Sequence, residues 1–233
     1  MTAEGNDLLK RAHGALALTD VYIRDSSAAL DDRFLPIVAL NDQWEVQTRI
    51  QTSFHRVVEG SADSSDGDEP AEAATFVEYK VVTGARFLHP SLLDGDGAPA
   101  IAGEVAVVFA LVYRASEALP NDVLGEFGRR NAPFHVWPYW REFLHSTTGR
   151  MRLPPAVLPM YQYSQPTAPT VGGEHDAGEV SQQPQLVVDT KGMFDLAFWS
   201  TAMGVTKDQL REAVTAAGSS PEKVRAFLSE HAH

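Results

Sequence analysis

The side chains with the best prospect of acid–base chemistry lie between residues 131 and 145. An apolar pocket could make His135 or Glu142 a general base, with Arg141 and His145 close by in the sequence. Neither histidine has an identifiable carboxylate to orient its ring. The GxSxG, P-loop, GxGxxG and HExxH motifs are missing. We therefore expect no enzymatic activity, cofactor or metal ion, and keep a small-molecule enzyme or carrier as an alternative.

The composition narrows the class of protein further. The chain has 31 acidic and 19 basic residues, a formal charge of −12 that repels nucleic acids and anionic membranes. The lack of cysteine excludes disulfides, thiol nucleophiles and cysteine-bound zinc. Glu4, Asp7 and Lys10 interrupt the region where a signal peptide would be apolar, and no segment is long and apolar enough to span a membrane. We expect a cytoplasmic protein without a membrane partner.

Aromatic and apolar side chains are unusually dense between residues 134 and 153. One short helix cannot bury all of them beneath one small sheet, so the surplus indicates an oligomer interface, a groove for apolar polypeptide, or both. With two aromatic residues from earlier in the chain, the candidate groove or interface residues are Tyr79, Phe87, Phe134, Trp137, Tyr139, Trp140, Phe143 and Leu153.

Four strands must position these residues. Alternating polar and apolar residues predict strands over residues 44–54 and 101–114, and β-branched and aromatic residues predict two more over 16–25 and 75–83. In the 44–54 strand the alternation places Ile50 and Phe54 on the core face and His55 on the wet face. With no helical pattern between them, the four strands predict an antiparallel sheet, and residues 59–72 predict an acidic, solvated loop.

A helix follows the sheet. Helix-compatible residues begin near Asn121, and a firmer pattern predicts a helix over residues 137–148, with Pro138 in its first turn and Gly149 at its stop. Residues 164–188 then have the composition of a flexible linker.

The remaining chain reads as three short helices. Gly204 ends the first, and Thr206 with Gln209 forms a capping box at the start of the second. We expect a chain divided into residues 1–163, the linker 164–188, and a small all-α unit over 189–233, whose core is marginal without outside contacts.

Two sequence motifs, together with the order of the predicted elements, resemble those of a known family. The stretch after residue 131 resembles the long helix of the SecB family of protein-export chaperones, with an aromatic residue, Pro-Tyr, a variable residue and Arg-Glu before an apolar helix, a glycine and a proline-containing segment. The matching residues are Trp137, Pro138, Tyr139, Trp140, Arg141, Glu142, Gly149, Leu153 and Pro154. Residues 21–25 (VYIRD) are similar to the first strand of that family. The resemblance covers about residues 16–160.

The resemblance implies an α+β fold with a four-stranded antiparallel sheet, assembled as a dimer or tetramer. It implies an ATP-independent chaperone that holds unfolded polypeptides or preproteins in apolar grooves, for protein transport or for a toxin–antitoxin pair. Family members dock onto the export motor ATPase through an acidic sheet surface. Asp25 matches that surface, whereas Ala29 and Tyr79 stand where acids are expected.

The C-terminal segment resembles a small bacterial helical domain of uncharacterised function. Its short turns would also suit a helix-turn-helix, with the sheet domain as its dimeriser. Residues 189–233, however, carry five basic and six acidic side chains, which disfavours a surface for DNA phosphates. A module for DNA or protein binding is therefore kept as an alternative.

Overall fold

The computed structural model describes residues 3–38, 44–62, 72–95, 97–158, 161 and 188–231. It confirms an α+β protein whose helices cover an antiparallel sheet. No helix in these ranges is long and apolar enough to cross a membrane.

The sheet is built from long strands in the order β1-β4-β3-β2, and every neighbouring pair is antiparallel. Their bounds are β1 Leu16–Leu30, β2 Glu45–Ala62, β3 Glu72–Leu93 and β4 Pro99–Ala115. Each strand extends past its predicted end, because antiparallel pairing continues through residues whose own alternation is weak. The proposed acidic loop is shorter than predicted: residues 59–62 and 72 belong to β2 and β3, and residues 63–71 lie outside the described part.

A β-bulge in β2 reverses the predicted alternation. The register shifts between Thr52 and Phe54, so that Ser53 is the extra residue. Beyond it, His55 turns toward the core face and its ring lies 5.7 Å from that of Tyr79. The expectation of His55 on the wet face is therefore wrong, because an inserted residue exchanges the two faces of a strand.

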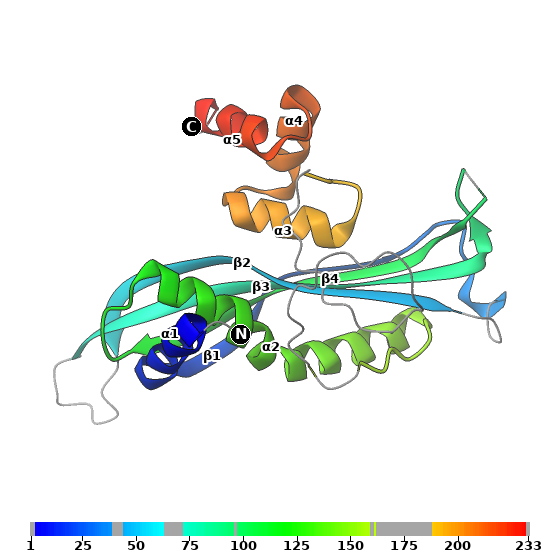
Figure 1. The fold of residues 1–233 in the computed structure, drawn as a ribbon. Helices are drawn as coiled ribbons and strands as arrows, with labels where there is room; N and C mark the ends of the chain where they lie inside the picture. The colour runs from blue at the N-terminus through cyan, green and yellow to red at the C-terminus, as the bar shows by residue number, and fades with distance from the viewer. Residues whose placement is uncertain are drawn as a thin grey trace.

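Two helices lie on one face of the sheet (Figure 1). The long α2, Asn121–Met151, contacts β2 and β3, and α1, Ala3–Ala15, packs beside it. Buried residues recur along α2 at helical spacing, as predicted for Trp137, Trp140 and Leu144. The sequence analysis did not anticipate α1.

Pro138 lies in the interior of α2 and not in its first turn. Pro133 also lies inside the helix, and each proline removes one backbone donor from the helical ladder. The helix continues because its apolar face is buried along the sheet, which offsets the lost hydrogen bonds. It ends where Arg152 adopts a left-handed conformation (φ 55°), and Leu153 N–H donates to the carbonyl of Thr148 at 3.0 Å.

The C-terminal helices cover the opposite face (Figure 1). They are α3 Met193–Met203, α4 Lys207–Ala217 and α5 Pro221–Glu230. α3 contacts β2, β3 and β4, whereas α4 and α5 lie farther from the sheet. The capping box of Thr206 and Gln209 at the start of α4 is confirmed. The division into residues 1–163 and 189–233 stays a prediction, because all but Val188 of the expected linker lies outside the described part.

Candidate functional site

The outer surface of α2 carries two large exposed aromatic side chains. Phe134 is 57 % exposed and Tyr139 is 48 % exposed, although both belong to a helix whose other face is fully buried. Exposed aromatic side chains on a helix that also forms the core make its outer side a candidate surface for apolar ligands.

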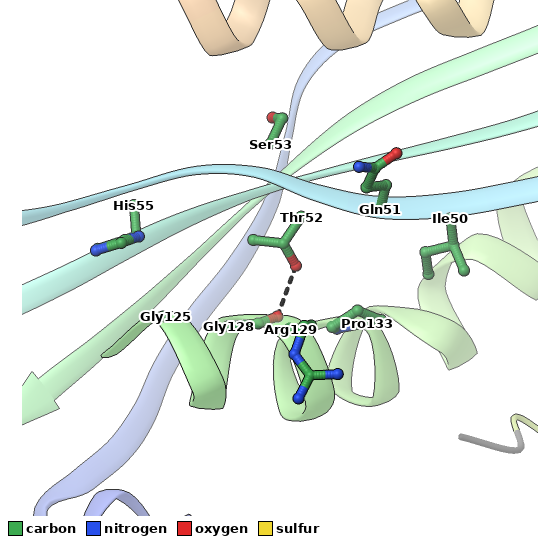
Figure 2. A pocket seen from close by; sticks show the side chains of 9 residues that line it. All are labelled: Ile50, Gln51, Thr52, Ser53, His55, Gly125, Gly128, Arg129 and Pro133. Carbon is green, nitrogen blue, oxygen red and sulfur yellow. Dashed lines mark hydrogen bonds between the residues drawn. The ribbon is translucent and has the colours of Figure 1, made fainter. Parts of the chain in front are cut away.

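A cavity of about 280 Å³ lies between α2 and β2 (Figure 2). Ile50, Thr52 and His55 reach it from the strand. Gly125 and Gly128 leave room on the helix side because they carry no side chain. Polar and apolar groups are mixed in its wall, so the cavity suits a polypeptide backbone with an apolar side chain.

Close contact between α2 and the sheet fixes one wall of this cavity. The Thr52 hydroxyl donates to the Gly128 carbonyl at 2.6 Å, and the Tyr79 hydroxyl donates to the Leu124 carbonyl at 2.9 Å. A Cβ at Gly128 would come within 2.6 Å of the Tyr79 ring, so only glycine permits this approach. These contacts hold α2 against β2 and β3 along one wall of the cavity.

A second cavity of about 380 Å³ lies on the other side of α2, against α1. Phe134, His135 and Tyr161 line it together with His13 of α1. Because Pro133 lines the first cavity and Phe134 the second, consecutive residues of α2 face two separate hollows. Of the two exposed aromatic residues, Phe134 lines the second cavity and Tyr139 lines neither.

The side chain of His135 makes a hydrogen bond within the second cavity. Its Nδ1 lies 2.7 Å from the Tyr113 hydroxyl. Burial, with a smaller effect from the charge of His13, lowers the pKa of His135, and burial raises the pKa of the Tyr113 hydroxyl. Burial therefore favours the neutral form of both partners of this hydrogen bond.

The structure separates the predicted groove residues into two sets. Phe134 and Tyr139 are exposed and Phe143 is half-buried, so these three offer surface to a ligand. The other five form part of the core: Tyr79, Phe87, Trp137, Trp140 and Leu153. The expectation that these five offer surface needs correction within this chain. Tyr79 and Phe87 share the side of β3 that faces α2, and Trp137 and Trp140 lie on the buried stripe of α2.

Asp25 lies on the opposite face of the sheet and already has a partner. Lys207, at the start of α4, places its Nζ 2.6 Å from Asp25 Oδ2. The acid that matched the motor-docking surface is therefore paired within the chain. Ala29 is exposed farther along β1, and Tyr79 is in the core, so neither adds to an acidic surface.

Of the two candidate bases for the alternative enzyme reading, His135 lines the second cavity. Glu142 is exposed on α2 and lines neither cavity beside that helix. In the described ranges no group of three or more metal-binding side chains gathers. Of the basic residues in the C-terminal helices, Lys207 pairs with Asp25 and Arg211 pairs with Asp208 at 2.9 Å.

Comparison with known proteins finds a family match and ten matching chains of solved structures. Residues 187–229 match a family described as a protein of unknown function, DUF3606. A Mycobacterium tuberculosis SecB-like chaperone, Rv1957, solved in complex with a ChAD peptide from the Rv1956 HigA1 antitoxin, is 14 % identical over 68 % of this chain and 99 % of that one, with a TM-score of 0.49. A protein of unknown function from Streptococcus agalactiae is 8 % identical over 62 % of this chain and 96 % of that one, with a TM-score of 0.24. No curated protein matches.

Proposed function

We propose that this protein is a SecB-like molecular chaperone that holds unfolded polypeptides, without ATP, along the outer surface of α2. The observation that carries the proposal is that α2 exposes two large aromatic rings, Phe134 and Tyr139, and that Phe134 lines one of the two cavities along this helix. An apolar segment of a client would bury its side chains against these rings, with about 25 cal/mol gained per Å² of apolar surface removed from water. Many such weak contacts give affinity without a sequence code.

The edge of the sheet supplies a second element of binding. Among the described strands β2 pairs only with β3, so its outer edge has backbone donors and acceptors without a strand neighbour. An extended client can add to such an edge by backbone hydrogen bonds while its side chains enter the cavity between β2 and α2. This mode suits unfolded chains, because every polypeptide carries the same backbone groups.

The proposal does not assign the export motor as a partner. Asp25 pairs with Lys207, and α3 lies over the sheet face on which Asp25 is found. Docking of a motor there would require the C-terminal helices to move. The sequence resemblance also implies a chaperone for a toxin–antitoxin pair. That role would use only the outer surface of α2, so we favour it over export.

Light scattering tests the holding function. A chemically unfolded client is diluted into nucleotide-free buffer with the wild-type protein, with a Phe134→Ser/Tyr139→Ser variant, or with Leu93→Ser. Leu93 is the matched control because it is 52 % exposed at the far end of β3. We expect wild type and Leu93→Ser to suppress aggregation and the double variant to lose most of this effect. Equal suppression by all three proteins would contradict client binding at the outer surface of α2. No suppression by the wild-type protein would contradict the proposed chaperone function.

A further inference from the structure

We propose that the sheet face opposite α2 is a second polypeptide-binding surface. It recognises a helix that carries an aromatic residue followed by a carboxylate, and α3 of the same chain is its ligand. This assigns a role to the C-terminal segment, whose matching family has no known function. The inference concerns the opposite face from α2 and does not rest on the proposed chaperone function.

The shape of the surface is matched to the aromatic residue. Phe194 of α3 lies directly over Gly84 of β3, where an added Cβ would meet Phe194 Cβ at 2.9 Å and Cδ2 at 2.8 Å. Rotation of the ring cannot relieve the first contact, because Phe194 Cβ is fixed to the helix backbone. Val82 of β3 and its register partner Val108 of β4 belong to the same apolar cluster as Phe194. Because Gly84 has no side chain, α3 can pack this close to β3.

The charge of the surface is matched to the carboxylate. Arg49 Nη1 of β2 donates to Asp195 Oδ1 at 2.7 Å, and Arg86 Nη2 of β3 donates to Asp195 Oδ2 at 3.2 Å. Asp195 is only 4 % exposed, so it enters a site that provides two cations for it. The Arg49 guanidinium also lies 4.5 Å from the centre of the Phe194 ring, which links both elements of recognition.

The contact between the C-terminal helices and the sheet resembles an interface between two separately folded units. The apolar cluster on the α2 side is complete without the C-terminal helices, and the cluster on the other side takes only Val82 and Val108 from the sheet. The remaining members come from the C-terminal segment, including Phe198, Trp199 and Leu210. Ion pairs surround this small apolar centre, as at interfaces between separate proteins.

Covalent connection explains why the chain's own helix occupies the surface. Tethering converts binding into an intramolecular event with a high effective concentration, so a helix of another protein must compete against it. Occupation by α3 therefore also regulates access to this face. A competing ligand would need the same pair of groups, an aromatic ring for Gly84 and a carboxylate for Arg49 and Arg86.

The test uses the full chain with a protease site inserted within residues 165–186 and an affinity tag at the N-terminus. After cleavage, the fraction of C-terminal fragment retained on the tagged part measures non-covalent docking, and size-exclusion chromatography checks for a discrete complex. Circular dichroism before cleavage confirms folding. We expect wild type to retain the fragment at micromolar concentration as a discrete complex.

Matched variants decide whether the recognised groups are those named. Gly84→Ala should raise the dissociation constant about tenfold. Asp195→Asn should raise it by a smaller factor, because Arg49 and Arg86 lose the charge of this carboxylate while Arg86 keeps Glu104 at 3.0 Å. Gly60→Ala is the control, since a Cβ there finds only an ordinary contact of 3.6 Å with Phe76. Separation of the wild-type fragments, or retention by Gly84→Ala equal to that of Gly60→Ala, would overturn the proposal.

Discussion

The two faces of the sheet meet their helices in different ways. On the α2 side, large rings such as Tyr79, Phe109 and Trp140 form one continuous apolar cluster, and Gly128 lets the helix sit close against the strands. On the α3 side, two valines and Gly84 form a small apolar centre among ion pairs. The α2 side packs as a large apolar core and leaves Phe134 and Tyr139 exposed on the helix, whereas the α3 side has a small apolar centre with ion pairs around it.

Truncation of one tryptophan on each side gives the largest expected contrast. Trp140→Ala should lower the free energy of unfolding by roughly 3–5 kcal/mol, because it empties the centre of the α2 cluster. Trp199→Ala removes a side chain that belongs to the C-terminal cluster, so it should lower the stability of the sheet by less than half as much. Urea titrations followed by circular dichroism provide the measurement. Equal losses would remove the distinction between core and interface.

Removal of the carboxylate from the α3 side should have the next largest effect. Asp195→Ala leaves Arg49 and Arg86 without their shared partner and should destabilise the docked state by about 1–3 kcal/mol. Hydrogen exchange of the α3 amides measures this loss. Asp208→Ala is the matched control, because the Asp208 side chain is 93 % exposed and its pair with Arg211 contributes little. Similar exchange in both variants would show that the ion pairs do not hold α3.

The helix cap of α4 allows a finer test of the C-terminal unit alone. The Thr206 hydroxyl accepts from Gln209 N–H at 3.2 Å, so Thr206→Ala should cost about 1 kcal/mol of helix stability. We expect faster amide exchange in α4 and unchanged exchange in α2. Equal acceleration in α2 would mean that both helical layers unfold as one unit.

Acidification should act on the α2 side with the smallest effect. Burial lowers the pKa of His55 and of His135 in the folded state, so the unfolded chain binds more protons once the pH falls below about 6.5. Their contribution to stability is complete above that pH and is lost as the pH falls toward the lowered folded-state values. Thermal unfolding between pH 7 and pH 5 should show this decline. His135→Gln should reduce it, and an unchanged decline would contradict the assignment.

The sequence was sufficient for features set by neighbouring residues. The strand over residues 101–114, the buried stripe through Trp140 and Leu144, and the capping box at Thr206 follow from residue patterns within one element, and each is found in the structure. The strand is buried on both faces over residues 102–111, so its predicted alternation does not appear in the burial. Pro138 was misplaced because the burial that sustains α2 through a proline comes from the sheet and not from the helix.

Features that depend on distant residues could not be predicted. The bulge at Ser53 changes which side of β2 His55 occupies, and no local residue pattern announces an inserted residue. The fit of Phe194 over Gly84 joins residues far apart in the chain, and neither is distinctive alone. The division of the aromatic residues into core and surface likewise needed the register of β3 against its neighbours.

Aggregation of an unfolded client, compared across variants of both sheet faces, decides where the polypeptide binds. We expect Phe134→Ser/Tyr139→Ser to lose the suppression of light scattering, and Gly84→Ala, which weakens the docking of α3, to retain at least the wild-type level. Full suppression by the double variant would contradict client binding on the outer surface of α2.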